Sequence, residues 1–174
     1  KGFSREAVEE LSHRRNEPDW LRQKRIDAWQ TYEQIPVPKR TDEEWRRTDI
    51  RLLPIDEVAP FGQLDGRVSS PADLPAAVAA QIQSAGDVSG VVVQHDSATT
   101  YFEVNPALAE QGVIFADLDT AIHEHADLLQ KYFMTDELVP ASENKFAALH
   151  GAFWTSGTLL YVPANVEVEL PFRA

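Results

Sequence analysis

Four carboxylates gather where a predicted strand gives way to a predicted helix: Asp117, Asp119, Glu124 and Asp127. Such oxygens could bind a hard cation, and with a nearby histidine they could activate water for hydrolysis. The chain lacks the Asp-x-Asp-x-Asp-Gly loop of a calcium site, and carboxylates at a helix start interact favourably with the helix dipole. We prefer the dipole interpretation and keep, as the alternative, a small metal-dependent hydrolase that uses the carboxylates from Asp117 to Asp127.

The spacing of the five histidines does not indicate a metal site. His123 and His125 lie two residues apart on a predicted helix, so their side chains point to different sides and cannot share a metal ion. The other three occupy ordinary positions: His13 on a helix face, His95 at a hairpin end and His150 within an apolar helix. We therefore assign no catalytic, cofactor-binding or metal-ligating residue to this chain.

Other catalytic motifs are also missing from the sequence. The chain has no cysteine, which excludes disulfides, thiolate nucleophiles and cysteine-ligated iron–sulfur or zinc centres within it. Its scattered glycines form neither a P-loop nor a dinucleotide-binding turn. Ser156-Gly157 precedes a predicted strand, whereas the nucleophile elbow of a hydrolase follows one.

Composition limits the classes of partner. The 174 residues are 43% hydrophobic, which is enough for a real core, and they carry 16 Lys and Arg against 28 Asp and Glu, a formal net charge of −12. That charge repels nucleic acid and anionic lipid. No apolar run approaches the roughly 20 residues of a spanning helix, and no secretory leader opens the sequence. These features make nucleic acid and membranes poor partners and fit a cytoplasmic location.

The first fifty residues predict three helices. Ser4 caps a short helix that ends near Asn16, and Pro18 suits the first turn of a second helix. After a proline-containing link at residues 35–38, Thr41 and Glu44 have the spacing of a capping box and predict a third helix.

Two residue types, arginine near residue 50 and tryptophan along the chain, allow further predictions. Arg46, Arg47 and Arg51 form a basic island, for which pairing with acidic residues of the same chain is favoured over binding an acidic partner. The tryptophans are expected to be mostly core residues: Trp20, Trp29, Trp45 and Trp154.

The rest of the chain predicts short strands and helices. A hairpin at residues 91–95 and 99–104 turns around residues 96–98, because both runs are rich in β-branched and aromatic residues. The other predicted elements are a weak helix at 76–82, a helical turn at 106–111, a strand at 113–115, one helix at 120–133, an apolar helix at 144–154, and strands at 159–162 and 166–170.

Two stretches resemble a known family. Arg25-Ile-Asp-Ala-Trp-Gln-Thr-Tyr-Glu-Gln-Ile-Pro-Val-Pro, followed by Arg40, Glu44-Trp-Arg-Arg-Thr-Asp and Leu52-Leu53, is similar to the N-terminal helical region of SufD-type proteins of the SUF iron–sulfur cluster assembly system. Gly112-Val-Ile-Phe-Ala-Asp-Leu-Asp-Thr-Ala and the stretch from Lys145 to Pro171 resemble the lead-in to the β-helix core shared by SufB and SufD proteins. The first stretch favours SufD over SufB.

The resemblance implies an α+β chain of four consecutive segments. These are a helical region (1–53), a connecting region with one weak helix (54–90), a small α/β unit with a β-hairpin (91–143), and an apolar helix with the first strands of a right-handed parallel β-helix (144–174). Because the chain opens at Lys1, has its only Met at position 134 and ends among unpaired strands, we expect it to be part of a longer protein.

The implied function is that of a scaffold, not an enzyme. The resemblance implies a non-ATPase subunit that joins a SufB-like subunit to a SufC-like ATPase while iron and sulfide are assembled into a cluster. It implies no cofactor in this segment, with the iron–sulfur cluster and a flavin belonging to the full complex. The residues linked to the cluster and to the ATPase lie in later regions of the family, so none is transferred here. An unrelated protein-binding module is the remaining alternative.

Overall fold

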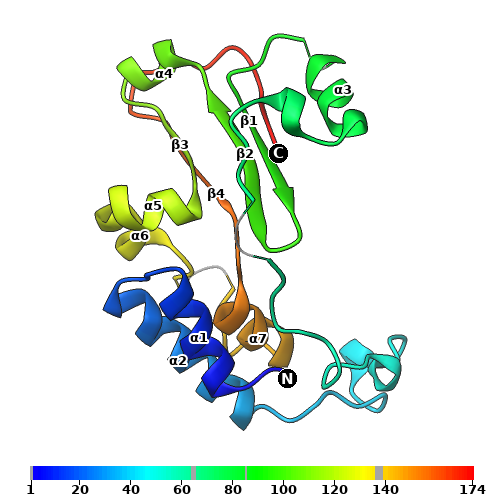
Figure 1. The fold of residues 1–174 in the computed structure, drawn as a ribbon. Coiled ribbons are helices and arrows are strands. Elements are labelled where there is room, and N and C mark those ends of the chain that lie inside the picture. Colours follow the sequence, from blue (N-terminus) through cyan, green and yellow to red (C-terminus); the bar gives the residue numbers. More distant parts are fainter. Residues whose placement is uncertain (1, 64–65, 85, 136–138) are drawn as a thin grey trace. The chain divides into compact units, whose positions relative to one another are not determined.

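The computed structural model describes residues 2–63, 66–84, 86–135 and 139–174 (Figure 1). The chain packs into two compact units, each built from two separate stretches. The helical unit comprises Lys1–Phe61 and His125–Trp154, and the sheet unit comprises Gly62–Glu124 and Thr155–Ala174. The units thus join stretches distant in sequence, whereas the four predicted segments follow the chain in order.

Three helices pack together in the helical unit: α1 (Arg5–Arg14), α2 (Asp19–Gln34) and α7 (Lys145–Phe153). The Ser4 hydroxyl accepts the Ala7 N–H at 3.2 Å, which confirms the predicted cap of α1. Pro18 immediately precedes α2 instead of lying in its first turn. A shorter helix, α6 (Ala126–Tyr132), completes the unit. The buried apolar residues of the helical unit as a whole are Val8, Leu11, Leu21, Ala28, Trp29, Leu129, Ala148, Ala152, Phe153 and Trp154.

The tryptophan prediction is confirmed in part. Trp29 and Trp154 are buried, with 5% of each exposed, and Trp29 packs edge-on against Phe153 of α7 at 5.8 Å between ring centroids. Trp20 and Trp45 are only half-buried. All four belong to the helical unit, so tryptophan fluorescence reports on that unit alone.

The predicted capping-box helix after Thr41 is wrong. The chain forms two single 3₁₀ turns there, Glu43–Trp45 and Ile50–Leu52. The carboxylate of Asp42 accepts the backbone N–H of Lys39 at 2.8 Å. Such local bonds from aspartate offer the backbone an alternative to a continuous helix.

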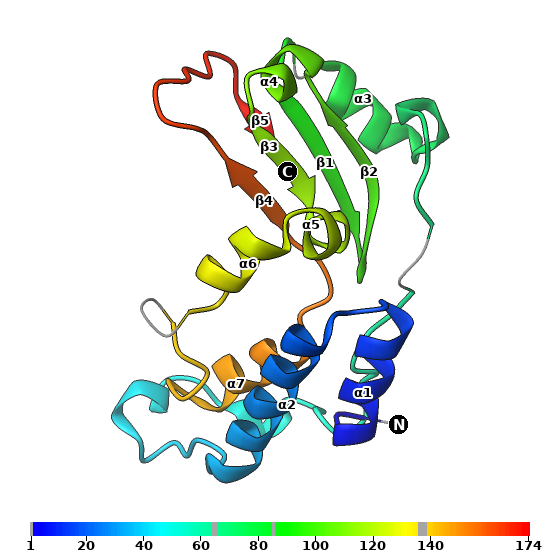
Figure 2. The same cartoon turned by 90° about the vertical axis from the view of Figure 1, so that its left-hand side faces the viewer.

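Two small sheets form the sheet unit (Figure 2). The predicted hairpin is confirmed, since β1 (Gly90–His95) pairs antiparallel with β2 (Ala98–Val104). On its other side β1 pairs in parallel with β5 (Phe172–Arg173). The second sheet pairs β3 (Ile114–Asp117) antiparallel with β4 (Thr158–Tyr161). The helices of this unit are α3 (Ala76–Ser84), α4 (Pro106–Glu110) and α5 (Leu118–Glu124), with a 3₁₀ turn at Pro71–Asp73.

Aromatic stacking holds the two sheets together. The Phe115 ring of β3 lies 5.1 Å from Phe102 of β2 and 4.5 Å from Phe172 of β5, measured between centroids. Gly90 of β1 makes this approach possible, because a Cβ at that position would lie 2.7 Å from the Phe115 ring and 2.9 Å from the Glu103 carbonyl oxygen. Phe115 is therefore the centre of the sheet unit's packing.

Two predicted elements differ from the structure. The single helix at 120–133 is wrong, because His125 (φ −130°, ψ 36°) separates α5 from α6 at the point where the chain passes between units. The strand at 166–170 is wrong too, since that stretch forms no strand and leads instead to β5. Ser89 holds it there: its N–H donates to the Pro171 carbonyl at 2.8 Å and its hydroxyl to the Leu170 carbonyl at 2.7 Å.

The mixed α+β class is therefore confirmed, and the parallel β-helix stays a prediction. The ladder from β3 to β4 is antiparallel, and the parallel pairing of β1 with β5 covers two residues. Among the described residues, no helix is both long and apolar enough to cross a membrane.

Candidate functional site

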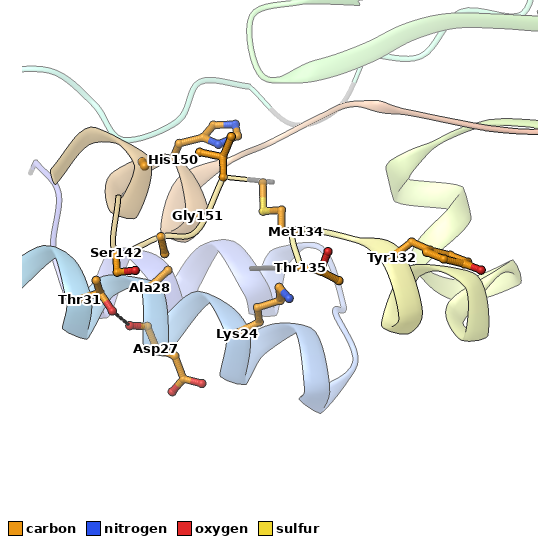
Figure 3. Close-up of a pocket in the computed structure, with 13 residues that line it drawn as sticks. Lys24, Asp27, Ala28, Thr31, Tyr132, Met134, Thr135, Ser142, His150 and Gly151 are labelled. Carbon is orange, nitrogen blue, oxygen red and sulfur yellow. Dashed lines mark hydrogen bonds between the residues drawn. The ribbon is translucent and has the colours of Figure 1, made fainter. Parts of the chain in front are cut away.

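A recess in the helical unit has a volume of about 540 Å³ (Figure 3). It lies where α2, α7 and the stretch after α6 meet. Its lining residues are Lys24, Asp27, Ala28 and Thr31 of α2, Ala147, His150 and Gly151 of α7, and Tyr132, Met134, Thr135, Val139, Ala141 and Ser142. Sequence analysis had not brought these residues together.

Small residues let the two helices meet beneath this recess. A Cβ on Gly151 would lie only 3.0 Å from the Ala28 Cβ. The polar groups around it bond locally, since Thr31 donates to the Asp27 carbonyl oxygen at 2.9 Å. His150 and the Asp27 carboxylate point away from each other in Figure 3, so they do not form an acid–base pair. Among its described lining residues, the recess offers a shape for binding and no acid–base pair of His150 with Asp27.

A buried ion pair lies at the centre of the helical unit. Arg25 of α2 is fully buried, and its Nε and Nη2 donate to the two carboxylate oxygens of Glu17 at 2.8 and 2.7 Å. Its Nη1 donates to the Ala152 carbonyl oxygen at 3.0 Å, and its guanidinium lies 4.1 Å from the Trp154 ring centroid. Arg25 thus donates through all three guanidinium nitrogens, and the cluster joins α2 to α7 as a structural contact.

Lysine makes a second junction between the same helices. Lys145 of α7 donates through Nζ to the carbonyl oxygens of Tyr32 and Ile35 at 2.7 and 2.8 Å. Its ammonium also lies 3.9 Å from the Tyr32 ring centroid. A cation at the carboxyl end of α2 complements the helix dipole.

Asp117, the first of the candidate carboxylates, is the N-cap of α5. It is 2% exposed, and its oxygens accept the backbone N–H and the hydroxyl of Thr120, each at 3.0 Å. The guanidinium of Arg67 lies 3.3 Å away and supplies a counter-charge. These contacts confirm the preferred interpretation for Asp117. Within the described part of the chain, no three metal-ligating side chains are grouped as a metal site requires. The hydrolase alternative therefore has no geometric support.

Replacement of Asp117 with alanine is expected to destabilise the protein by about 0.5–2 kcal/mol, because α5 loses its cap. Asp117→Asn keeps an oxygen that can accept the Thr120 N–H and is expected to lose less. Urea unfolding followed by circular dichroism measures both. Asp127→Ala, at an exposed position, is the control. Stoichiometric metal in the wild type that Asp117→Asn removes would contradict this account.

The outer strand of the second sheet exposes apolar residues. In the described structure β4 pairs only with β3. Near its end, Leu160, Tyr161 and Val162 are 48%, 40% and 39% exposed. An unpaired edge with apolar side chains is a place where another strand can add. This edge is a candidate interaction surface.

Comparison with known proteins identifies the family. A family model described as the SufBD protein N-terminal region matches residues 6–173. The chain belongs to the SufBD family. This confirms the resemblance carried by the stretches around Trp29 and Phe153, which form the core of the helical unit.

SufBD relatives cover the whole chain. An iron–sulfur cluster assembly SufBD family protein of Mycobacterium tuberculosis (strain ATCC 25618 / H37Rv) is 33% identical over 183 residues. One of Staphylococcus aureus (strain USA300) is 30% identical over 182 residues. Both alignments include 100% of this chain, but they span only 21% and 37% of the respective relatives. The chain thus corresponds to a limited part of these longer proteins.

Proposed function

We propose that this chain is the N-terminal part of a SufD-like scaffold subunit of the SUF iron–sulfur cluster assembly system. Its role is structural and interactive, and it is not an enzyme. The observation that carries the proposal is the match of residues 6–173 to the SufBD N-terminal region, together with relatives named for iron–sulfur cluster assembly. The absence of cysteine agrees with it, since cluster ligands of that kind would come from elsewhere.

The assignment to SufD over SufB rests on the stretch from Arg25 to Pro38. Arg25 and Trp29 of this stretch are buried in the helical unit, so the resemblance involves residues that determine packing. In this proposal the protein works in the cytoplasm with a SufB-like subunit and a SufC-like ATPase, which bind mostly outside this segment. The iron–sulfur cluster and a flavin belong to the assembled complex.

The exposed edge of β4 supports a continuing sheet. Leu160, Tyr161 and Val162 leave apolar surface beside unpaired backbone groups. Further strands of the same protein would cover this edge if the predicted right-handed parallel β-helix begins there. The segment then acts as the entry to the scaffold.

Association with the other two subunits tests the proposal. The full-length protein is expected to form a stable complex with the SufB-like and SufC-like subunits from the same source, measured by size-exclusion chromatography with light scattering. Residues 1–174 alone are the matched control and should associate much more weakly, because the main contacts lie outside them. Failure of the full-length protein to join under conditions where the other two associate would remove the proposal.

A further inference from the structure

One exposed surface of the helical unit combines leucines with arginines. Leu52 is 85% exposed and its neighbour Leu53 is 51% exposed. We call the patch formed by Arg46, Arg47, Arg51, Leu52 and Leu53 the Leu52 surface. Figure 1 shows this segment, in cyan, reaching outward from the helices of its unit. A large aliphatic side chain so exposed beside a second one is the feature that needs a partner.

Local hydrogen bonds fix the turn that presents Leu52. The Asp49 carboxylate accepts the Arg51 backbone N–H at 3.2 Å and the Arg51 Nε and Nη2 at 2.9 and 2.7 Å. The Leu53 N–H donates to the Ile50 carbonyl oxygen at 3.1 Å. These bonds from Arg51 hold the pKa of Asp49 well below its usual range, so the turn keeps its charge pair into acidic pH as well. Leu52 is thus held in place before any partner arrives.

Contacts on either side attach this segment to the helical unit. The Trp45 ring lies 5.3 Å from Phe146 of α7, measured between centroids. Beyond the leucines, the Arg14 guanidinium of α1 lies 5.5 Å from the Phe61 ring centroid. Because both ends are held, the exposed leucines belong to an anchored surface. Anchoring lowers the entropy lost when a partner binds.

The charge of this surface differs from that of the chain. Residues 46–53 contain three arginines and one aspartate, a net charge of 3 − 1 = +2, whereas the chain carries −12. Arg46 lies 3.6 Å from Glu43 and Arg51 lies 2.7 Å from Asp49, which confirms the predicted internal pairing for these two. The Arg46 pair is exposed, and such pairs add little stability. Carboxylates of a partner can therefore compete for Arg46.

We infer that the Leu52 surface docks another protein of the cluster assembly complex, one that offers an apolar pocket bordered by carboxylates. Leu52 is the anchor that enters the pocket, and the arginines meet the acidic rim. The inference rests on the proposed function, because the partner is taken from that complex. Two copies of this chain paired through this patch would bring their arginines together, and the negative charge of the chain opposes anionic membranes.

Binding measurements with substituted full-length protein test the inference. We compare the wild type with Leu52→Ser/Leu53→Ser and with Arg46→Glu/Arg47→Glu, using the SufB-like and SufC-like subunits as the probes. Each double variant is expected to weaken Kd for one subunit by about tenfold or more, as loss of an interface anchor does. Affinity of the wild type should fall with added salt, and less steeply for the arginine variant.

Matched controls separate docking from folding. Val37→Ser removes another exposed apolar side chain of the helical unit, 59% exposed, and Arg22→Glu reverses an exposed charge on α2. Both should bind as the wild type does. Each of the four variants should lose no more than about 1 kcal/mol of stability in thermal unfolding, because the substituted side chains are exposed. The arginine variant keeps the test valid if the serine variant folds poorly.

Each outcome has a distinct meaning. If the wild type joins the complex and both double variants bind equally well, the inference is overturned while the proposed function stands. If the wild type does not associate at all, the proposed function fails, and the inference that rests on it fails too. Leucine-dependent self-association, or binding to phosphatidylglycerol vesicles in place of the subunits, would also overturn it.

Discussion

Replacing Arg25 with methionine is expected to lower the free energy of unfolding of the helical unit by up to about 3–5 kcal/mol, because a buried carboxylate loses the side chain that donates two hydrogen bonds to it. The Glu17 side chain is fully buried, and Arg25 supplies two hydrogen bonds to it. Methionine would fill much of the space but leave the carboxylate with the weaker Arg15 contact, whose Nε lies 3.5 Å from Glu17 Oε1. Urea unfolding followed by tryptophan fluorescence reports the change, since all four tryptophans belong to this unit.

Arg22→Met on the same helix is the matched control. Arg22 lies 3.0 Å from Asp19, but its side chain is 54% exposed, so its loss should cost about 1 kcal/mol or less. The double variant Arg25→Met/Glu17→Gln should recover part of the stability, because the buried negative charge that Arg25 paired is removed as well. If Arg25→Met destabilises no more than Arg22→Met, the ion pair is not what holds α2 to α7.

Truncation of Phe115 to alanine should destabilise the sheet unit by about 3–5 kcal/mol, through lost burial and the cavity that remains. The ring is 7% exposed and contacts Phe102 and Phe172, which belong to different strands. Hydrogen exchange of the β1 and β2 amides measures the effect within this unit, where tryptophan fluorescence gives no signal.

Leu160→Ala is the matched control for Phe115→Ala, because it truncates an exposed residue of the same β3–β4 strand pair. Leu160 pairs directly with Phe115 across β3 and β4, but it is 48% exposed. Its truncation should cost about 1 kcal/mol or less, as surface substitutions usually do. Equal acceleration of exchange in the two variants would show that the aromatic stack is not the centre of the unit.

The helices with clear periodicity could be predicted from the sequence. Leu21, Ala28 and Trp29 recur at helical spacing and all three are buried in α2. Arg25 lies on the same face, four residues after Leu21, and that position was the available signal for a buried arginine. Its contacts with Ala152 and Trp154 could not be predicted, because those residues are more than a hundred positions away and only tertiary packing brings them to α2.

Strand pairing was predictable only where it was local. The hairpin needed no distant information, since Asp96 and Ser97 connect two β-branched runs. The alternation of Val166 and Val168 predicted a strand, yet Ser89 bonds to the residues after it and the pairing strand is β5. Tertiary context overrode the local pattern there.

Of the candidate site residues, Asp117 is the one whose structural role could be predicted from the sequence. Its position between a strand and a helix predicted an interaction with the helix start, and the structure shows the cap. Arg67, fifty residues earlier, lies in a region without a regular pattern, so its contact with Asp117 had no signal in the sequence. The leucines at 52 and 53 were noticed only as part of a family stretch, because exposure is a property of the folded chain.

Cluster content of the reconstituted complex tests the central claim most directly. The full-length protein is combined with the SufB-like and SufC-like subunits, reconstituted anaerobically with iron and sulfide, and analysed for iron and acid-labile sulfide after gel filtration. The account predicts that the three-subunit complex retains both and that omission of this protein lowers the cluster retained. Equal retention without it would contradict a scaffold role in iron–sulfur cluster assembly.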